Sequence, residues 1–338
     1  GHAARDGGAP VNKRERVMAA IRGEPVDRVP FSFWLHNFAR EDSARALTEE
    51  TLRLHRAFDW DFLKPQSRYQ CFAEMWGLEY RQAPDRAEWP VITKLPLRSA
   101  ADLATIAPAD PTKGALAEQL EAMSAIRAAA GPDVPVVATV FAPLMVAQFM
   151  VPGGIDAVLK LAREDAPKLE RGLEAIAATQ EAFTRELVAR GVDGIFYATN
   201  VATKNLLTPG EFRRFQRPYD RRILEAAGSL PFNIVHMCGG GILFEEFADY
   251  PVSVFSWATT TGNPSLTEVH RRTGRAVLGG LPAKPEIKAM TPEALVARAR
   301  ASLAEMGGRH HLLGPDCSIN PDTPEELLHA VGAAVRNA

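Results

Sequence analysis

The sequence predicts an α/β fold, a (β/α)8 TIM barrel formed by residues 11–338 as a single domain. Apolar runs that are typical of buried strands alternate with segments of helical spacing, which indicates a parallel sheet. About eight strand–helix units can be counted, and eight units favour a closed barrel over an open sheet. The length of 338 residues suits such a barrel with insertions, and no low-complexity tract or composition change marks a domain boundary.

Short apolar runs that end at glycine, proline or polar residues predict the strands. The run VPVVATVF is apolar throughout, as is typical of a strand buried on both faces. The run after Pro231 ends at a glycine triplet and predicts the central strand. The predicted strands are residues 28–35, 61–65, 134–141, 193–199, 232–238, 252–257, 276–281 and 310–313.

Helical spacing and capping residues predict the segments between the strands. The sequences TPEA at 291 and TPEE at 323 each place a threonine cap before a proline in the first turn, a common helix start. We expect helices at 13–22, 41–57, 111–130, two within 155–190 split near Pro167, 208–227, a short one after the central strand, one from 265, 291–306 and one from 323. Residues 68–108 are rich in proline and predict a hairpin, and residues 1–10 predict a flexible tail that begins with a tag remnant, Gly1-His2.

Composition and charge exclude several classes of function. Hydrophobic residues make up 46% of the chain and charged residues 24%, which is ordinary for a globular enzyme. The net charge of −2 gives no electrostatic reason to expect nucleic acid as a partner. No window approaches the roughly 18 apolar residues of a membrane helix. Three widely spaced cysteines do not form a disulfide framework, so we expect a cytoplasmic protein whose thiols bind metal or pack in the core.

The segment PFNIVHMCGGG carries the strongest chemical signal. His236 and Cys238 lie two residues apart at the end of the central strand, and side chains at that spacing project to the same side. Cys317 follows the last predicted strand. Because catalytic groups of a TIM barrel lie at the carboxyl ends of its strands, these three side chains are expected to meet there. One imidazole and two thiolates with an open fourth position are typical of catalytic zinc, although both cysteines also fit a reading as core residues.

Other residues are expected to line the barrel mouth as substrate-binding groups because they lie at or near predicted strand ends. They are His36, Gln66, Phe141, Tyr197, Asn200 and Trp257. Tyr197 fits a core position equally well. Cys71 has no partner motif and is expected in the core. Asp316, next to Cys317, and backbone carbonyls are candidates for the acceptor that orients the imidazole of His236.

Several motifs resemble the uroporphyrinogen decarboxylase superfamily, whose members are TIM barrels. They are NKRERVMAAIRGEPVDRVPFSFW, FDWDFLKP, TVFAPLMVAQFM, LLTPGEFRRFQRPYDRRI, LGGLPAKPEI and GPDCSINPDTPEELL, and they cover nearly the whole chain. The H-x-C pair at His236 and Cys238, with Cys317 in a G-P-x-C context, is similar to the zinc-dependent methylcorrinoid:coenzyme M methyltransferase branch. The resemblance implies that these three residues hold Zn²⁺ and are catalytic. It also implies methyl transfer from a methylated corrinoid (cobalamin) on a separate partner protein to a thiol or similar small acceptor.

The sequence departs from the decarboxylases where their substrate is held. Members that decarboxylate porphyrinogens carry R-Q-A-G-R after the first strand, and residues 34–38 here are WLHNF. The methyltransferase pattern also differs, because the strand at 276–281 runs into LGGLPAKPE. Two alternatives therefore remain: a decarboxylase (carboxy-lyase) of a smaller carboxylated substrate, and a non-catalytic zinc-binding barrel. A homodimer is compatible with exposed barrel helices.

Overall fold

A parallel sheet forms the centre of the molecule. The computed structural model describes residues 11–259 and 262–338. Six neighbouring strands pair in the order in which they occur along the chain, each parallel to the next, and all of their residues but Phe141 are buried. These strands are β3 (Val137–Phe141), β4 (Gly194–Thr199), β5 (Ile234–Met237), β6 (Val254–Trp257), β7 (Ala276–Leu281) and β8 (His311–Pro315).

Two extended segments close the sheet into a barrel. Phe31 bridges Leu313 of β8 in parallel, and Leu63 bridges Val136 just before β3. The amide of Asp61 donates to the carbonyl of Phe31, so the two segments also contact each other. They occupy the positions of the first two predicted strands but form isolated bridges there. The predicted TIM-barrel fold is confirmed.

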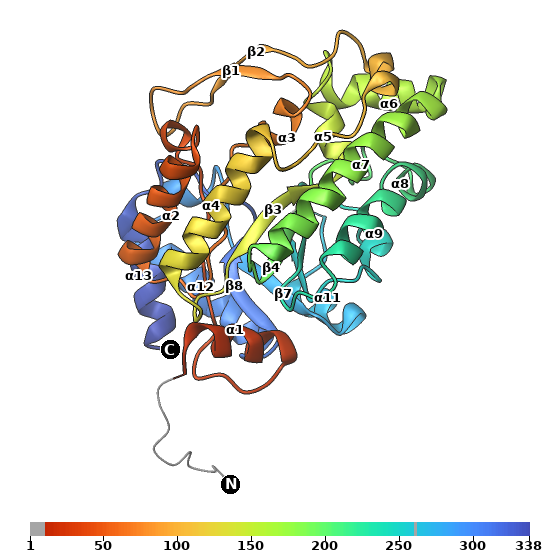
Figure 1. The fold of residues 1–338 in the computed structure, drawn as a ribbon. Helices are drawn as coiled ribbons and strands as arrows, with labels where there is room; N and C mark the ends of the chain where they lie inside the picture. Colours follow the sequence, from red (N-terminus) through yellow and green to blue (C-terminus); the bar gives the residue numbers. More distant parts are fainter. Residues whose placement is uncertain (1–10, 260–261) are drawn as a thin grey trace.

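Helices cover the outside of the barrel (Figure 1). Most predicted helices occur within a few residues of their expected ends. The α-helices of the described residues are α1 (Lys13–Arg22), α2 (Ala44–Phe58), α3 (Cys71–Glu74), α4 (Gly114–Ala130), α5 (Pro143–Gln148), α6 (Gly154–Glu164), α7 (Ala166–Ala189), α8 (Pro209–Phe215), α9 (Arg217–Ala226), α10 (Phe244–Phe247), α11 (Leu266–Thr273), α12 (Pro292–Met306) and α13 (Glu325–Arg336).

The single helix predicted for residues 208–227 is in fact two helices. Thr208 caps α8 as expected, with its side chain accepting from the amide of Glu211. The backbone of Gln216 then leaves the helical region, with φ −122° and ψ −60°, directly before Arg217-Pro218. Pro218 has no backbone N–H to donate to the carbonyl of Arg214, and its ring would clash with that carbonyl in a continuous helix, which explains the break. A new helix, α9, starts there.

The predicted hairpin forms above the carboxyl ends of the strands. Strands β1 (Glu79–Arg81) and β2 (Val91–Lys94) pair antiparallel. Figure 1 shows them at the end of the barrel opposite α1. The loop that joins them carries Trp89, which reaches the cavity described below. The hairpin therefore forms part of the barrel mouth.

The opposite end of the barrel is closed by α1 and a buried ion-pair network. Asp61 is fully buried and pairs with the guanidinium groups of Arg16, at 2.8 Å, and Arg28, at 2.7 Å. Its carboxylate also accepts from the backbone amide of Phe31, at 2.9 Å. A buried carboxylate needs such partners to offset its lost hydration. The amino-terminal motif thus has a structural role at the bottom of the barrel.

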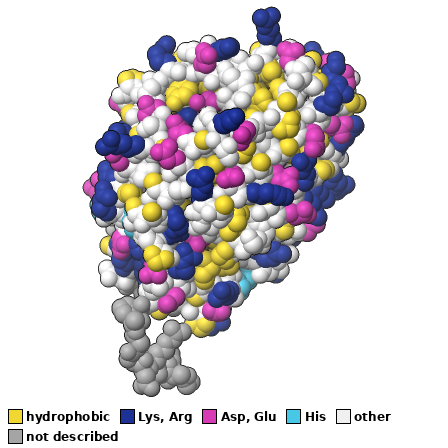
Figure 2. Space-filling view, in the orientation of Figure 1, with side chains coloured by type: hydrophobic (Ala, Val, Ile, Leu, Met, Phe, Trp, Pro, Cys, Tyr) yellow, Lys and Arg dark blue, Asp and Glu magenta, His cyan; other side chains and the backbone are white. Residues whose placement is uncertain are grey.

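The surface is of mixed charge, and no described helix has the length and apolar character required to cross a membrane. On the face seen in Figure 2, acidic and basic side chains are interspersed. This face therefore offers no basic stripe of the kind that binds nucleic acid. Residues 1–10, for which we predicted a flexible tail, lie outside the described residues.

Gly194, the first residue of β4, offers a test of the barrel packing. A Cβ atom there would lie 1.5 Å from the carbonyl oxygen of Phe232, which is backbone and has little freedom to shift. We expect Gly194→Ala to lower the free energy of unfolding by more than the ~1–3 kcal/mol typical of overpacking. Urea denaturation measures this change. Gly210→Ala is the control, because its Cβ would meet nothing closer than Thr208 Oγ1 at 3.9 Å. Equal stability of the two variants would contradict so close an approach of the two backbone segments.

Candidate metal centre and its cavity

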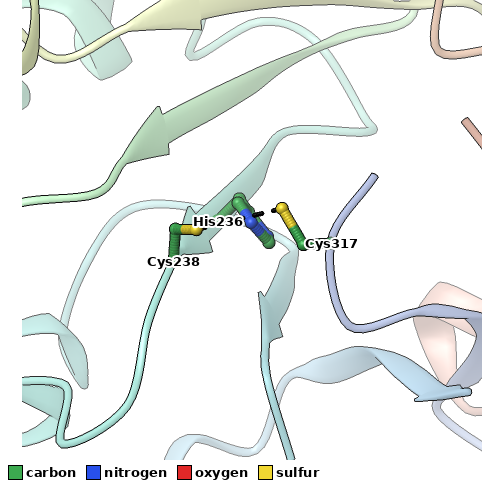
Figure 3. A group of neighbouring side chains, drawn as sticks. All are labelled: His236, Cys238 and Cys317. Carbon is green, nitrogen blue, oxygen red and sulfur yellow. Dashed lines mark hydrogen bonds between the residues drawn. The ribbon is translucent and has the colours of Figure 1, made fainter. Parts of the chain in front are cut away.

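The ends of β5 and β8 bring together the three predicted metal ligands (Figure 3). His236 lies on β5, and Cys238 follows the last residue of that strand. Cys317 comes two residues after β8 ends at Pro315. Directly after Cys238, Gly239 turns the chain with φ 102°, a conformation that favours glycine. The glycine triplet thus lets the backbone leave the strand directly beside the three side chains.

The three ligand atoms have the spacing of a small metal site. One atom each from His236, Cys238 and Cys317 lies within 4.8 Å of the others. The two sulfurs are 3.9 Å apart. Tetrahedral zinc with Zn–S bonds of ~2.3 Å would separate two sulfurs by about 3.8 Å. His236 Nε2 is buried and has no hydrogen-bond partner in the described part of the chain. The donor set therefore fits zinc, and within residues 11–259 and 262–338 no other cluster of three such ligands occurs.

The two thiols differ in their affinity for a proton. The hydrogen bond from Cys238 holds the pKa of Cys317 well below its usual range, and the positive charge of Lys284 acts in the same direction. The pKa of Cys238 is raised by the same pairing and by burial. The Cys317 thiol therefore loses its proton more readily than the Cys238 thiol. A bound metal ion would displace that proton, because metal-bound cysteine is a thiolate.

The imidazole of His236 is oriented by its neighbours on β4 and β6. Its Nδ1 lies 2.9 Å from Ser256 Oγ, on the residue that pairs with His236 in the β5–β6 register. The Phe196 ring stacks against it at 5.1 Å between centroids. When Nδ1 donates to Ser256, Nε2 carries the lone pair that faces the two sulfurs. Asp316, a predicted acceptor for the ring N–H of His236, forms no hydrogen bond with this ring. Its carboxylate instead accepts from Thr259 Oγ1 at 3.2 Å.

A cavity of about 330 Å³ opens beside the three ligands and contains most of the predicted substrate-binding residues. Its volume is near the lower end of the range for small-molecule sites. Four of the six predicted residues lie on its wall: His36, Gln66, Phe141 and Asn200. The binding role of these residues remains a prediction.

Tyr197 and Trp257 are not part of this cavity, for the same physical reason. Successive side chains of a strand point to opposite faces. On β4, Phe196 and Ala198 line the cavity, so Tyr197 points away from it, toward the surrounding helices. There its buried hydroxyl donates to Asp220 on α9. Trp257 follows the inward-facing Ser256, and its indole donates to the carbonyl of Pro264 at 2.9 Å. The structure therefore places both predicted substrate-binding residues in the core.

Two lysines on the cavity wall are not among the site residues that the sequence predicted. Lys64 and Lys284 follow the second and seventh strand segments, and each directly precedes a proline. The available signal was this repeated Lys-Pro at a strand end within FDWDFLKP and LGGLPAKPE. Lys284 Nζ donates to Ser318 Oγ at 2.6 Å, next to Cys317. Burial lowers the pKa of Lys64 to about 7. The cavity beside the three candidate ligands thus carries two amino groups.

A chain of hydrogen bonds connects Lys64 to a buried carboxylate. Lys64 Nζ donates to Gln66 Oε1 at 2.9 Å, so the amide nitrogen of Gln66 must donate to His36 Nε2, at 3.1 Å. His36 Nδ1 then carries the proton and donates to Glu41 at 2.8 Å. Through this chain, Glu41 fixes the tautomer of His36 and the orientation of Gln66. Cys71, as expected, is fully buried away from the cavity.

Comparisons with known proteins agree with the fold, and several of the similar proteins are methyltransferases. The chain matches the family described as uroporphyrinogen decarboxylase (URO-D) over residues 12–338. It is 26% identical over 337 residues to the methylcobamide:CoM methyltransferase MtaA of Methanosarcina barkeri, covering 95% of this chain and 96% of that protein. It is 27% identical over 356 residues to the uroporphyrinogen decarboxylase of Alkalilimnicola ehrlichii, covering 96% and 94%.

Solved structures show the same fold. A methyltransferase from Methanosarcina mazei superposes with a TM-score of 0.83 at 24% identity, covering 97% of this chain and 99% of that one. A B12-independent methionine synthase from Shewanella superposes with a TM-score of 0.60 at 14% identity, covering 92% and 96%. The likeness in fold therefore extends over nearly the whole barrel.

Proposed function

Because the chain belongs to the uroporphyrinogen decarboxylase (URO-D) family, we propose that it is the kind of member that transfers methyl groups. The donor is a methylated corrinoid carried by a separate protein, and the acceptor is a thiol or similar small molecule activated by zinc. The relatives named as methylcobamide:CoM methyltransferases support this reading, since they match nearly the whole chain. The protein would act in the cytoplasm, and a homodimer is compatible with the fold.

The observation that carries the proposal is the set of three ligands at the barrel mouth. His236, Cys238 and Cys317 supply one nitrogen and two sulfurs within 4.8 Å of one another. Three protein ligands leave a fourth position of tetrahedral zinc for a substrate, which is the arrangement of catalytic sites. The cavity beside these atoms provides the room for that substrate.

Zinc held by these residues would supply a Lewis acid that lowers the pKa of an acceptor thiol. The sulfur–methyl bond then forms as the cobalt–carbon bond breaks, and the electron pair stays with cobalt. The chain's own residues hold the acceptor in line and exclude water from the reacting sulfur. Phe196 and Trp34 form apolar parts of the wall, and they contact each other edge to face at 5.4 Å.

The cavity favours methyl transfer over decarboxylation of a porphyrinogen. Its wall includes Trp34 and His36 from the segment where the decarboxylases carry arginines. The lysines of the cavity are Lys64 and Lys284, and no arginine lies among its described lining residues. Decarboxylation of a smaller acid remains the second candidate, because two lysines are suited to a carboxylate.

Metal analysis tests the proposed function directly. Protein purified without chelator is expected to contain about one zinc per chain. A thiol reagent is expected to modify Cys238 and Cys317 slowly until a chelator removes the metal. A methylated corrinoid protein and a thiol should then yield the methyl thioether only with the metal-loaded protein. Absence of zinc, with both thiols freely titratable, would contradict the proposal.

A further inference from the structure

Part of the cavity wall consists of aromatic side chains from four separate segments. We define the aromatic arc as Tyr69, Trp89, Phe141 and Phe149. Tyr69 contacts Trp89 edge to face at 5.4 Å and Phe149 at 5.2 Å between centroids, and Phe149 lies 6.3 Å from Phe141. These distances are typical of attractive ring pairs. The arc is thus one continuous surface of rings along the cavity.

The arc is incompletely covered by the protein itself. Trp89 exposes 55% of its surface, although its ring also contacts the rings of Phe38, at 4.5 Å, and His36, at 5.8 Å. Apart from Val91 on the same hairpin, no other large hydrophobic side chain in the described residues is exposed. A half-exposed tryptophan at the mouth of a cavity leaves an apolar ring face open to a ligand.

The same cavity also presents an amino group that lacks a carboxylate partner among the described residues. Lys64 is 8% exposed, and in the described part of the chain its ammonium forms no ion pair. It donates one hydrogen bond, to Gln66, and lies 4.6 Å from the centroid of Phe196. Buried lysine is rare unless it is paired. The remaining donors of this ammonium are therefore available to an anionic group of a ligand.

We propose that the natural occupant of the cavity is a planar aromatic acid that bears the acceptor thiol. Its ring packs on the aromatic arc and its acid group binds Lys64. Its identification as the methyl acceptor rests on the proposed function. Phe196 contacts both Lys64 and His236, so the acid site and the metal ligands share one wall. The cavity of about 330 Å³ has the volume of roughly 11 water molecules at ~30 Å³ each, enough for a six-membered ring with two substituents.

Thiol-free probes test the acid and ring sites without any methyl transfer. Isothermal titration of the metal-loaded protein compares benzoate with ethanesulfonate and with cyclohexanecarboxylate, which has a similar volume but no aromatic face. Benzoate is expected to bind roughly 3- to 10-fold more tightly than either. Trp89→Ala should remove most of this preference, and Lys64→Met should weaken all three acids about tenfold or more. Equal binding of the three acids, or an unchanged preference in Trp89→Ala, would overturn the proposal.

Matched variants separate these effects from general damage. Trp76→Ala removes a partly buried indole that donates to the carbonyl of Ala107 outside the cavity, and Lys160→Met removes an exposed ammonium on α6. Both should bind benzoate as the unmodified protein does. Because the probes carry no thiol, their failure to bind would leave zinc-dependent methyl transfer standing. If zinc is absent instead, acid binding remains measurable.

Acceptor competition completes the test. With a methylated corrinoid protein as donor, 3-mercaptobenzoate is expected to show a higher kcat/KM than 2-mercaptoethanesulfonate, a short aliphatic thiol acid. The ratio should fall in Trp89→Ala, because that change removes a ring of the aromatic arc. A higher kcat/KM for the aliphatic thiol would contradict the assignment of the arc to the acceptor.

Discussion

Replacing Cys317 by alanine is expected to abolish both zinc retention and methyl transfer. The change removes one of the three candidate ligands and leaves Cys238 and His236 without the sulfur that completes the proposed site. The loss of metal affinity should exceed the ~10- to 100-fold effect of losing an outer partner of a ligand. Metal content after dialysis and the rate of thioether formation measure the two effects.

The same variant distinguishes the candidate functions. A decarboxylase that relies on the cavity lysines would keep its activity in Cys317→Ala, whereas a zinc-dependent methyltransferase would not. A barrel with purely structural zinc predicts a large drop in melting temperature and no response of the metal to added thiols. Cys71→Ala is the matched control, because Cys71 is fully buried and absent from the cavity wall. Its zinc content and methyl transfer should match those of the unmodified protein.

Replacing Ser256 by alanine is expected to weaken zinc binding about 10- to 100-fold, the usual effect of losing the partner that orients a ligating histidine. Ser256 Oγ lies 2.9 Å from His236 Nδ1, and both residues are buried. Without this acceptor the imidazole loses the preference for the tautomer that presents Nε2 to the sulfurs. Competition with a metal-binding dye measures the zinc affinity.

A second buried serine provides the control for this prediction. Ser302 donates to the carbonyl of Gly280 at 2.6 Å and does not contact any of the three metal-ligand candidates. Ser302→Ala should cost stability, by about 1 kcal/mol for the lost hydrogen bond, and leave zinc affinity unchanged. If Ser256→Ala and Ser302→Ala both retained full zinc affinity, His236 would not depend on Ser256 for its orientation.

The sequence alone predicted the barrel and the three metal-ligand candidates. Strand period and helix capping act over a few residues, so the run of β3 and the Thr208 cap could be recognised without tertiary contacts. The ligands were recognisable because His236 and Cys238 share one strand end and Cys317 follows another. Parallel strands place such ends together whatever the rest of the packing.

Only the tertiary structure decided which way other strand residues point and which groups meet across the barrel. Tyr197 and Trp257 were assigned to the mouth by their place in the chain, and the pleat directs both to the core. Ser256 and Lys64 acquire their roles only beside His236 and Gln66, which the fold brings next to them. Sequence periodicity indicates which residues are buried, whereas the register between neighbouring strands determines which side chains lie next to each other.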